Sequence, residues 1–330
     1  MRRRPRSDNF RSTRRSCTYY PVDSPELSER MTAAFPIDGF YTNLLYQDLG
    51  HVVPYSLGRD QGGRARLTGA DAEKALPIVS AALSDGGYPS LEDGVRDFVS
   101  STAQNLVFGG RCTYELAFLA PLQSETDEHP VGFEFPLVIP GTISTRDGAP
   151  IQYVLPSLSE LRDRNGLAYV ALDPDTLVEF TLPGELVAPV RRLIAFLQTA
   201  NKEQGKEFGL MEQSVIKRTD YDFSAHKLER GELFAKVTQP VGWNVRDLFP
   251  DNQLEPYVTW RQIRFLEFQV KLRDRILDRL NYGIKLAGAK LGFETTIQLE
   301  GLPTHEDVEQ AKEDFRTGRK GFPELLRLAI

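Results

Sequence analysis

The stretch SLEDGVRDFVSSTAQNLVFGGRCTYELAFL, residues 90–119, changes its hydrophobic period in the middle. Its first half carries a stripe at steps of three and four, which predicts one face of a helix. That stripe consists of Leu91, Val95, Phe98, Thr102 and Leu106. After Gly109-Gly110 the period becomes two, which predicts one face of a strand at Cys112, Tyr114, Leu116 and Phe118. No cluster of titratable residues accompanies this change, so the glycine joint has no evident chemistry.

Strand-like sequence continues for roughly sixty residues beyond Phe118. Asp147-Gly148 lies between two strand-like arms and is the strongest hairpin signal in the chain. The segment 167–185 predicts two further short strands around Asp173-Pro174. Short strands joined by short turns predict an antiparallel sheet, and with the helices they indicate an α+β fold.

Two further helices are predicted before residue 206. Residues 69–83 form the first, with a kink or break at Pro77 and a stop at Gly86-Gly87. The second begins near Glu185 and ends at Gly205, with a buried stripe at Val190, Leu193, Ile194 and Leu197. Residues 206–257 show no clear period and are predicted to form loops and short elements.

The longest predicted element is an amphipathic helix over residues 258–286, about 43 Å long at 1.5 Å per residue. Its apolar face is wide, which predicts burial on more than one side. Residues 292–301 follow as a strand between two glycines. Thr304 is then predicted to cap a last helix, with Asp307 placed as in a capping box.

Composition is that of a soluble globular protein. The 330 residues are 41% hydrophobic and 26% charged, and no run of about eighteen apolar residues predicts a membrane span. Cys17 and Cys112 lie far apart in unlike contexts, which argues against a disulfide framework or a zinc site and favours a reducing compartment.

The charge is divided unevenly along the chain. Residues 1–16 hold seven arginines and one acid, so this arm carries about +6 and the rest of the chain about −12 of the net −6. The arginines are Arg2, Arg3, Arg4, Arg6, Arg11, Arg14 and Arg15. A solvated, disordered tail, a nucleic-acid contact and an organelle transit peptide all fit this composition, in that order of preference.

No catalytic, metal-binding or cofactor-binding motif is present. None of the four histidines has a partner at metal-ligand spacing, and neither a GxxxxGK[ST] loop nor a GxSxG elbow occurs. Cys112 shares its predicted strand face with Tyr114 and is interpreted as a core thiol. An enzyme assembled in space from Cys112 or His226 is the third hypothesis for function, because triads need not be close in sequence.

The polar side of the long helix has two interpretations. Acidic residues are interspersed with its basic ones, which favours a solvated face with mixed ion pairs. The alternative is a surface for DNA or an acidic partner. The DNA-contact candidates here are Arg261, Arg264, Lys271 and Arg275, in addition to the seven arginines of the arm.

The order of these elements resembles the portal proteins of tailed bacteriophages. The resemblance is carried by NLVFGGRCTYELAFL, by FPLVIPGTI, RDGAP and IQYVL, and by LVEFTLPGEL followed by a helix. The long helix, FETTIQLEG and THEDVEQAKEDFRTG are similar to the C-terminal part of the family. The resemblance covers roughly residues 32–321 and implies an antiparallel wing-like sheet with packed helices.

The resemblance also implies a division of the chain. Residues 1–31 would be a basic, flexible arm and residues 32–330 a portal-like domain. Within that domain, residues 32–184 would be wing-like, 185–257 stem- or clip-like or irregular, and 258–330 the long helix with its C-terminal strand and helix.

The function implied is mechanical and not enzymatic. Portal subunits form a dodecameric ring at one capsid vertex, through which double-stranded DNA is packaged and ejected and on which the terminase docks. Capsid or head–tail connector proteins would be further partners, no cofactor or membrane is expected, and the location would be the virion, or the bacterial cytoplasm during assembly. The alternative is a non-enzymatic nucleic-acid-binding or regulatory protein that uses the arginine-rich arm.

Overall fold

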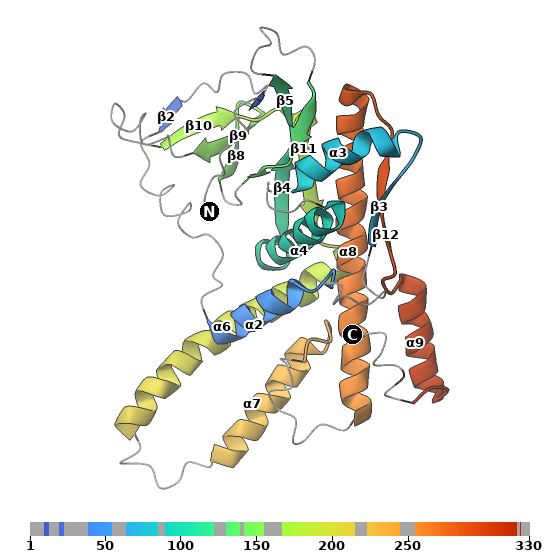
Figure 1. Cartoon of the computed structure of the whole chain (residues 1–330). Coiled ribbons are helices and arrows are strands. Elements are labelled where there is room, and N and C mark those ends of the chain that lie inside the picture. Colours follow the sequence, from blue (N-terminus) through green and yellow to red (C-terminus); the bar gives the residue numbers. More distant parts are fainter. Residues whose placement is uncertain are drawn as a thin grey trace. The chain divides into compact units, whose positions relative to one another are not determined.

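The computed structural model describes residues 10–12, 20–22, 39–54, 64–84, 90–121, 130–138, 142–154, 167–214, 223–244, 255–321 and 324. Of these, the side chains of residues 10–12, 20–22, 121, 154, 167–168, 202–230 and 255 are not described. The chain has two compact units. Unit 1 comprises Met1–Phe35, Ser56–Thr181 and Ile276–Gly301, and unit 2 comprises Pro36–Tyr55, Leu182–Arg275 and Leu302–Ile330. Every described strand belongs to unit 1 and unit 2 is helical, so the predicted α+β class is confirmed (Figure 1).

The helix–glycine–strand joint lies in unit 1 as predicted. Helix α4 (Leu91–Gly109) begins at Ser90, whose hydroxyl accepts a hydrogen bond from the Asp93 amide at 3.1 Å. It ends at Gly110, which has a φ of 76° and donates its amide to the Leu106 carbonyl at 2.8 Å. A side chain is strained in that left-handed conformation, and for this reason glycine suits the position. Strand β4 (Arg111–Glu115) starts at the next residue.

Strand β4 is buried on both faces and not only on the predicted one. Thr113 and Glu115 are buried as well as Cys112 and Tyr114. It is the middle strand of the antiparallel sheet β11–β4–β7, formed with β11 (Leu177–Thr181) and β7 (Leu137–Val138), and α4 packs against it. Tyr114 also packs against Phe98 of α4, with ring centroids 4.7 Å apart.

The other strands form further small antiparallel sheets, in agreement with the predicted antiparallel pairing. Strands β1 (Phe10–Ser12), β5 (Ala117–Pro121) and β6 (Gly132–Glu134) form one sheet. A second sheet has the order β2–β10–β9–β8 and a third pairs β12 with β3. Their bounds are β2 Tyr20–Val22, β3 Arg64–Thr68, β8 Ile143–Arg146, β9 Ala149–Val154, β10 Leu167–Ala171 and β12 Thr296–Glu300.

The turn between β8 and β9 confirms the predicted hairpin. Asp147 and Gly148 have φ values of 52° and 81°, as a two-residue type I′ turn requires. Strands β10 and β11 are both present around Asp173-Pro174, but they join different sheets because a 3-10 turn, Pro174–Thr176, separates them.

Parts of the arginine-rich arm are ordered in unit 1. Residues 10–12 pair with β5 and residues 20–22 pair with β10. Residues 10–12 therefore form a strand within the segment 1–16, for which a solvated tail was the preferred prediction. The remaining arginines of residues 1–9 and 13–19 lie outside the described residues.

Unit 2 is built from α2 (Phe40–Leu49), α6 (Gly184–Ser214), α7 (Phe223–Thr238), the first part of α8 (Glu255–Leu291) and α9 (His305–Thr317). Helix α2 packs along α6, where Asn201 accepts from the Tyr41 amide at 3.1 Å and donates to the Thr42 hydroxyl at 3.0 Å. Helix α6 does not end at Gly205 as predicted but continues to Ser214. The described parts of residues 206–257 (206–214, 223–244 and 255–257) are thus largely helical, whereas loops and short elements were expected.

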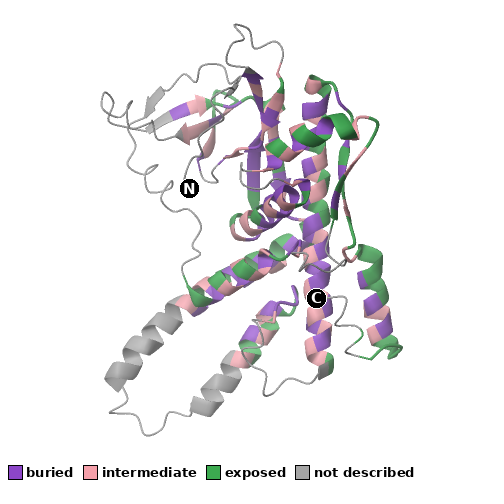
Figure 2. Ribbon diagram, viewed as in Figure 1, coloured by how far each residue is buried: buried purple, intermediate pink, exposed green. Residues whose placement is uncertain are grey.

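Helix α8 is longer than the predicted 258–286 by a turn or so at each end, and its 37 residues span about 55 Å. Its wide apolar face is buried as predicted, and Ile263, Leu272, Ile276, Leu280 and Ile284 are at most 1% exposed (Figure 2). None of the described helices is long and apolar enough to cross a membrane. Helix α9 has the predicted capping box between Thr304 and Asp307 and ends at Gly318.

Helix α3 (Ala72–Leu83) continues through Pro77 and ends before Gly86-Gly87, which lie outside the described residues. It packs against α4, and Gly94 of α4 allows this close approach. A Cβ at Gly94 would lie 3.3 Å from the Leu83 backbone.

Candidate functional site

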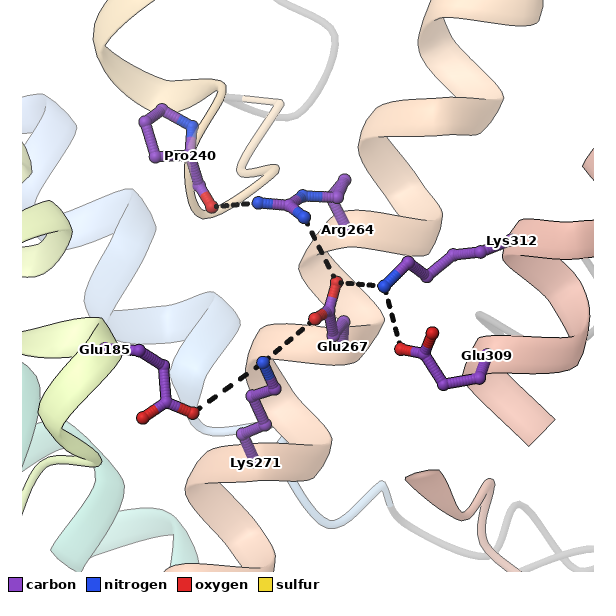
Figure 3. Close-up of polar contacts among 7 residues, drawn as sticks. All are labelled: Glu185, Pro240, Arg264, Glu267, Lys271, Glu309 and Lys312. Carbon is purple, nitrogen blue, oxygen red and sulfur yellow. Dashed lines mark hydrogen bonds and ion pairs between the residues drawn. The ribbon is translucent and has the colours of Figure 1, made fainter. Parts of the chain in front are cut away.

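A buried carboxylate organises the helices of unit 2. Glu267 of α8 is only 8% exposed, and three cations surround it (Figure 3). Its Oε1 lies 3.0 Å from Lys271 Nζ, and its Oε2 lies 3.4 Å from both Lys312 Nζ and Arg264 Nη1. Arg264 and Lys271 lie one turn before and after Glu267 on α8, while Lys312 comes from α9. The carboxylate therefore ties α9 to α8.

The same cations reach further elements of unit 2. Lys271 Nζ is 3.7 Å from a carboxylate oxygen of Glu185 on α6, and Lys312 Nζ is 2.8 Å from one of Glu309 on α9. Arg264 donates to the Pro240 carbonyl, in the turn after α7, at 3.1 Å. We call these side chains the Glu267 network: Glu185, Arg264, Glu267, Lys271, Glu309 and Lys312 (Figure 3).

The network fixes the charge state of its centre. Burial alone would raise the pKa of Glu267, but the hydrogen bond and charge of Lys271, followed by the charges of Lys312 and Arg264, hold the pKa below its ordinary value. Burial opposes the charge of Lys312 in the same way, and Glu309 and Glu267 nevertheless raise the pKa of that ammonium. Glu267 is therefore an ionised structural group at neutral pH, with its charge matched on several sides.

A second buried polar contact joins α2, α7 and α8. Arg261 is 2% exposed, and its guanidinium donates to the Thr238 hydroxyl and to the Trp243 carbonyl. Trp243 is 1% exposed and donates its indole N–H to Asp48 Oδ2 at 2.8 Å. Arg261 thus binds the end of α7 and the following turn from within the core of unit 2.

The turn after α7 approaches α8 so closely that only glycine fits. Gly242 has a φ of 78°, and a Cβ there would lie 2.3 Å from the Phe265 amide nitrogen and 2.4 Å from the Arg261 carbonyl oxygen. Both the left-handed conformation and the contact with backbone exclude a side chain.

An open groove with a mostly apolar lining lies between the start of α8 and the end of α9, and its volume is about 660 Å³. Trp260 and Phe315, two of its lining residues, stack with ring centroids 5.6 Å apart. We call it the aromatic groove, and it is lined by Pro256, Tyr257, Trp260, Glu309, Lys312, Glu313, Phe315 and Arg316. Its charged residues pair with one another: Lys312 with Glu309 at 2.8 Å, and Arg316 with Glu313 at 2.9 Å.

The predicted DNA-contact residues are separated by the structure. Arg2, Arg3, Arg4, Arg6, Arg14 and Arg15 lie outside the described residues, and Arg11 is in β1 with its side chain not described. On α8, Arg275 is exposed, while Arg264 and Lys271 belong to the Glu267 network. Arg261 does not lie on a solvated face as predicted, because its guanidinium is buried and hydrogen-bonded within unit 2.

Cys112 has the environment of a core thiol, as predicted. It is 1% exposed, and burial, assisted by the charge of Glu179, raises the pKa of the thiol to about 12. A thiol with that pKa is protonated at neutral pH and is a poor nucleophile. The side chain of His226 is not described, and among the described residues no three His, Cys, Asp or Glu side chains come together as a metal site.

Sequence patterns alone did not indicate the groove or the buried role of Arg261. The groove joins residues roughly fifty positions apart on two helices, and no periodicity reports that packing. A weak signal was present, since Tyr257, Trp260 and Arg261 stand together at the start of the long apolar pattern.

No protein-family model matches the sequence, and no curated protein matches it significantly. Among solved structures, the chain is similar to a chain from the neck of a native GTA particle that was computed with C12 symmetry. The sequences are 11% identical, the match covers 92% of each chain, and the TM-score is 0.45. A TM-score below 0.5 is too low to assign a fold or a function to this chain.

Proposed function

We propose that this chain is a structural ring subunit that resembles a phage portal. The order of elements from α4 to α9 carries this proposal. The glycine joint of α4 and β4, the β8–β9 hairpin, β11 followed by α6, the long α8, and β12 followed by α9 all occur in the order that the resemblance implies.

The helices of residues 184–238 add support. A portal has two stem helices between its wing strands and its long helix, and a clear pair was not evident in the sequence. Helices α6 and α7 occupy this position in the chain and contact each other, with the rings of Phe196 and Phe234 4.8 Å apart. They are therefore the proposed counterparts of the stem pair.

The proposed role is mechanical. The subunit would form a ring, near twelve copies, at a capsid vertex, and double-stranded DNA would pass through it during packaging and ejection. The terminase and the capsid or head–tail connector proteins would dock on it. A body that carries about −12 outside the arm repels phosphates and would let DNA slide without adhering through counterion release.

The test is the mass of the purified full-length chain by light scattering, with negative-stain images of the same fraction. A closed ring with a mass near twelve times the 37.2 kDa of one chain is expected. A monomer at every concentration, with no rings in the images, would overturn the proposal and leave the arginine-rich arm as the basis of a DNA-binding function.

A further inference from the structure

The aromatic groove of unit 2 has the features of a site for an apolar helix. Its lining includes three aromatic side chains, and its charged side chains already neutralise one another in the pairs Glu309–Lys312 and Glu313–Arg316. Such a groove offers little to a highly charged ligand. An amphipathic helix that lays apolar side chains on Tyr257, Trp260 and Phe315 fits this lining.

The last nine residues of the chain have the matching pattern. The segment 322–330, FPELLRLAI, carries one acidic and one basic side chain and is otherwise apolar. Its spacing predicts a helix with Pro323 in the first turn and one apolar stripe, at Phe322, Leu325, Leu326, Ala329 and Ile330. Nine residues would make about two and a half turns of helix, roughly 13 Å long.

The turn after α9 starts on the far side of that helix from the groove. Lys320 Nζ pairs with Asp314 Oδ2 at 2.8 Å, and the Arg319 amide donates to the Asp314 carbonyl at 3.0 Å. With 3.6 residues per turn, Asp314 lies about 130° around α9 from the groove residues Glu309, Glu313 and Arg316. Because the chain leaves α9 on this flank, the groove of a second copy is the better-placed acceptor.

We propose that segment 322–330 of one copy binds as a helix in the aromatic groove of a second copy. This contact rests on the proposed ring function and deepens it by naming a contact between neighbouring subunits. It joins two different surfaces, so it is heterologous, and a heterologous contact repeated with the right rotation closes a ring.

Two full-length variants and a control test the contact. Leu326→Asp places a charge in the apolar stripe of the segment. Tyr257→Glu places a charge in the groove. The position is in the first turn of α8, where an acidic side chain is tolerated. The Arg261 guanidinium lies 5.6 Å from the centre of the Tyr257 ring and would face the new carboxylate. Leu328→Asp makes the same change as Leu326→Asp but off the stripe. We expect Leu326→Asp and Tyr257→Glu each to raise, by at least tenfold, the protein concentration below which oligomers dissociate. Leu328→Asp should leave that concentration unchanged.

Mixing the two variants shows whether the contact joins separate copies. A mixture of Leu326→Asp and Tyr257→Glu retains one intact segment and one intact groove. A one-to-one complex is therefore expected by light scattering, at a concentration at which each variant alone has dissociated. A mixture that stays monomeric would overturn the contact between copies.

Trp260 gives an independent measure of groove occupancy. A synthetic peptide of residues 321–330, added to the Leu326→Asp chain, should shift the Trp260 emission to the blue, and it should have no effect when Tyr257→Glu is also present. Trp243, the other tryptophan, is 1% exposed and should not respond.

If rings form normally in Leu326→Asp and the peptide changes nothing, the contact is wrong and the ring proposal stands. If Leu326→Asp abolishes association but the wild type forms only open oligomers, the contact stands and the ring proposal fails.

Discussion

At the scale of single residues, Glu267 shows how an ion pair can organise a core without forming an active site. Glu267→Gln would leave Lys271, Lys312 and Arg264 facing one another without the central charge. Because these cations are partly exposed, we expect a loss of about 2 kcal/mol in the free energy of unfolding of unit 2. Both tryptophans, Trp243 and Trp260, belong to unit 2, so urea unfolding followed by their fluorescence measures this loss.

The same substitution predicts a pH dependence. The folded pKa of Glu267 is lowered, so its contribution is complete above the ordinary value of 4.5 and is lost as the pH falls through the folded pKa. The difference in stability between wild type and Glu267→Gln should therefore be constant above pH 4.5 and narrow below it. Glu313→Gln, at an exposed pair on α9, is the control and should behave like wild type at neutral pH. A constant difference down to acid pH would contradict this role of Glu267.

Gly242 predicts a larger effect from a single methyl group. Gly242→Ala combines a left-handed backbone with a Cβ 2.3 Å from the Phe265 nitrogen, so we expect a loss of about 3 kcal/mol or more. Gly318→Ala is matched in conformation, with a φ of 65°, but has open space around the new Cβ, and should cost about 1 kcal/mol. Tryptophan fluorescence in urea compares both variants within unit 2. Equal losses would show that the close approach of the turn to α8 does not matter.

At the scale of elements, the start of helix α4 depends on its cap at Ser90. Ser90→Ala removes the acceptor for the Asp93 amide and should cost about 1 kcal/mol. Faster hydrogen exchange at the amides of Glu92, Asp93 and Gly94 would report it locally. Ser101→Ala, in the middle of the same helix, should leave these amides unaffected, because alanine is the stronger helix former there. Equal exchange rates at these amides in Ser90→Ala and Ser101→Ala would contradict the capping role of Ser90.

The elements that were predicted correctly are those whose signal is local. Helix α4, its glycine joint, the Asp147-Gly148 hairpin and the Thr304 capping box each follow from residues within a few positions of one another. Gly205 was a wrong end for α6, because one glycine costs a helix only about 1 kcal/mol and is tolerated in its interior. Helix α7 was not predicted because its buried residues, such as Phe234 and Thr238, do not form a long apolar stripe.

The features that were missed depend on distant partners. Strand β1 has three residues and pairs with β5 more than one hundred residues later, and such short strands have no periodicity. Arg261 was assigned to a polar face because charged residues usually lie there. Its burial depends on a carbonyl of Trp243 and a hydroxyl of Thr238 that come from another element.

At the scale of the whole molecule, the uneven charge predicts how the chain would hold DNA. An acidic body with a basic arm should bind duplex weakly and through the arm, so the slope of the logarithm of affinity against the logarithm of salt concentration counts the phosphates that the arm neutralises. Replacing Arg2, Arg3, Arg4 and Arg6 with glutamine should reduce this slope by about 0.9 for each phosphate that is no longer neutralised. These four positions precede β1, so its pairing with β5 is retained.

The controls separate charge from other effects. Lysine at the same four positions keeps the charge and should keep the slope, while Arg275→Gln tests the exposed position on α8 and should change the slope by about 0.9 at most, the value for one phosphate. Affinities measured by fluorescence anisotropy on a short labelled duplex, from low to physiological salt, give the slopes. An unchanged slope in the glutamine variant would place the DNA contacts outside residues 2–6. If Arg275→Gln then lowered the slope, the DNA would contact α8 at this exposed position.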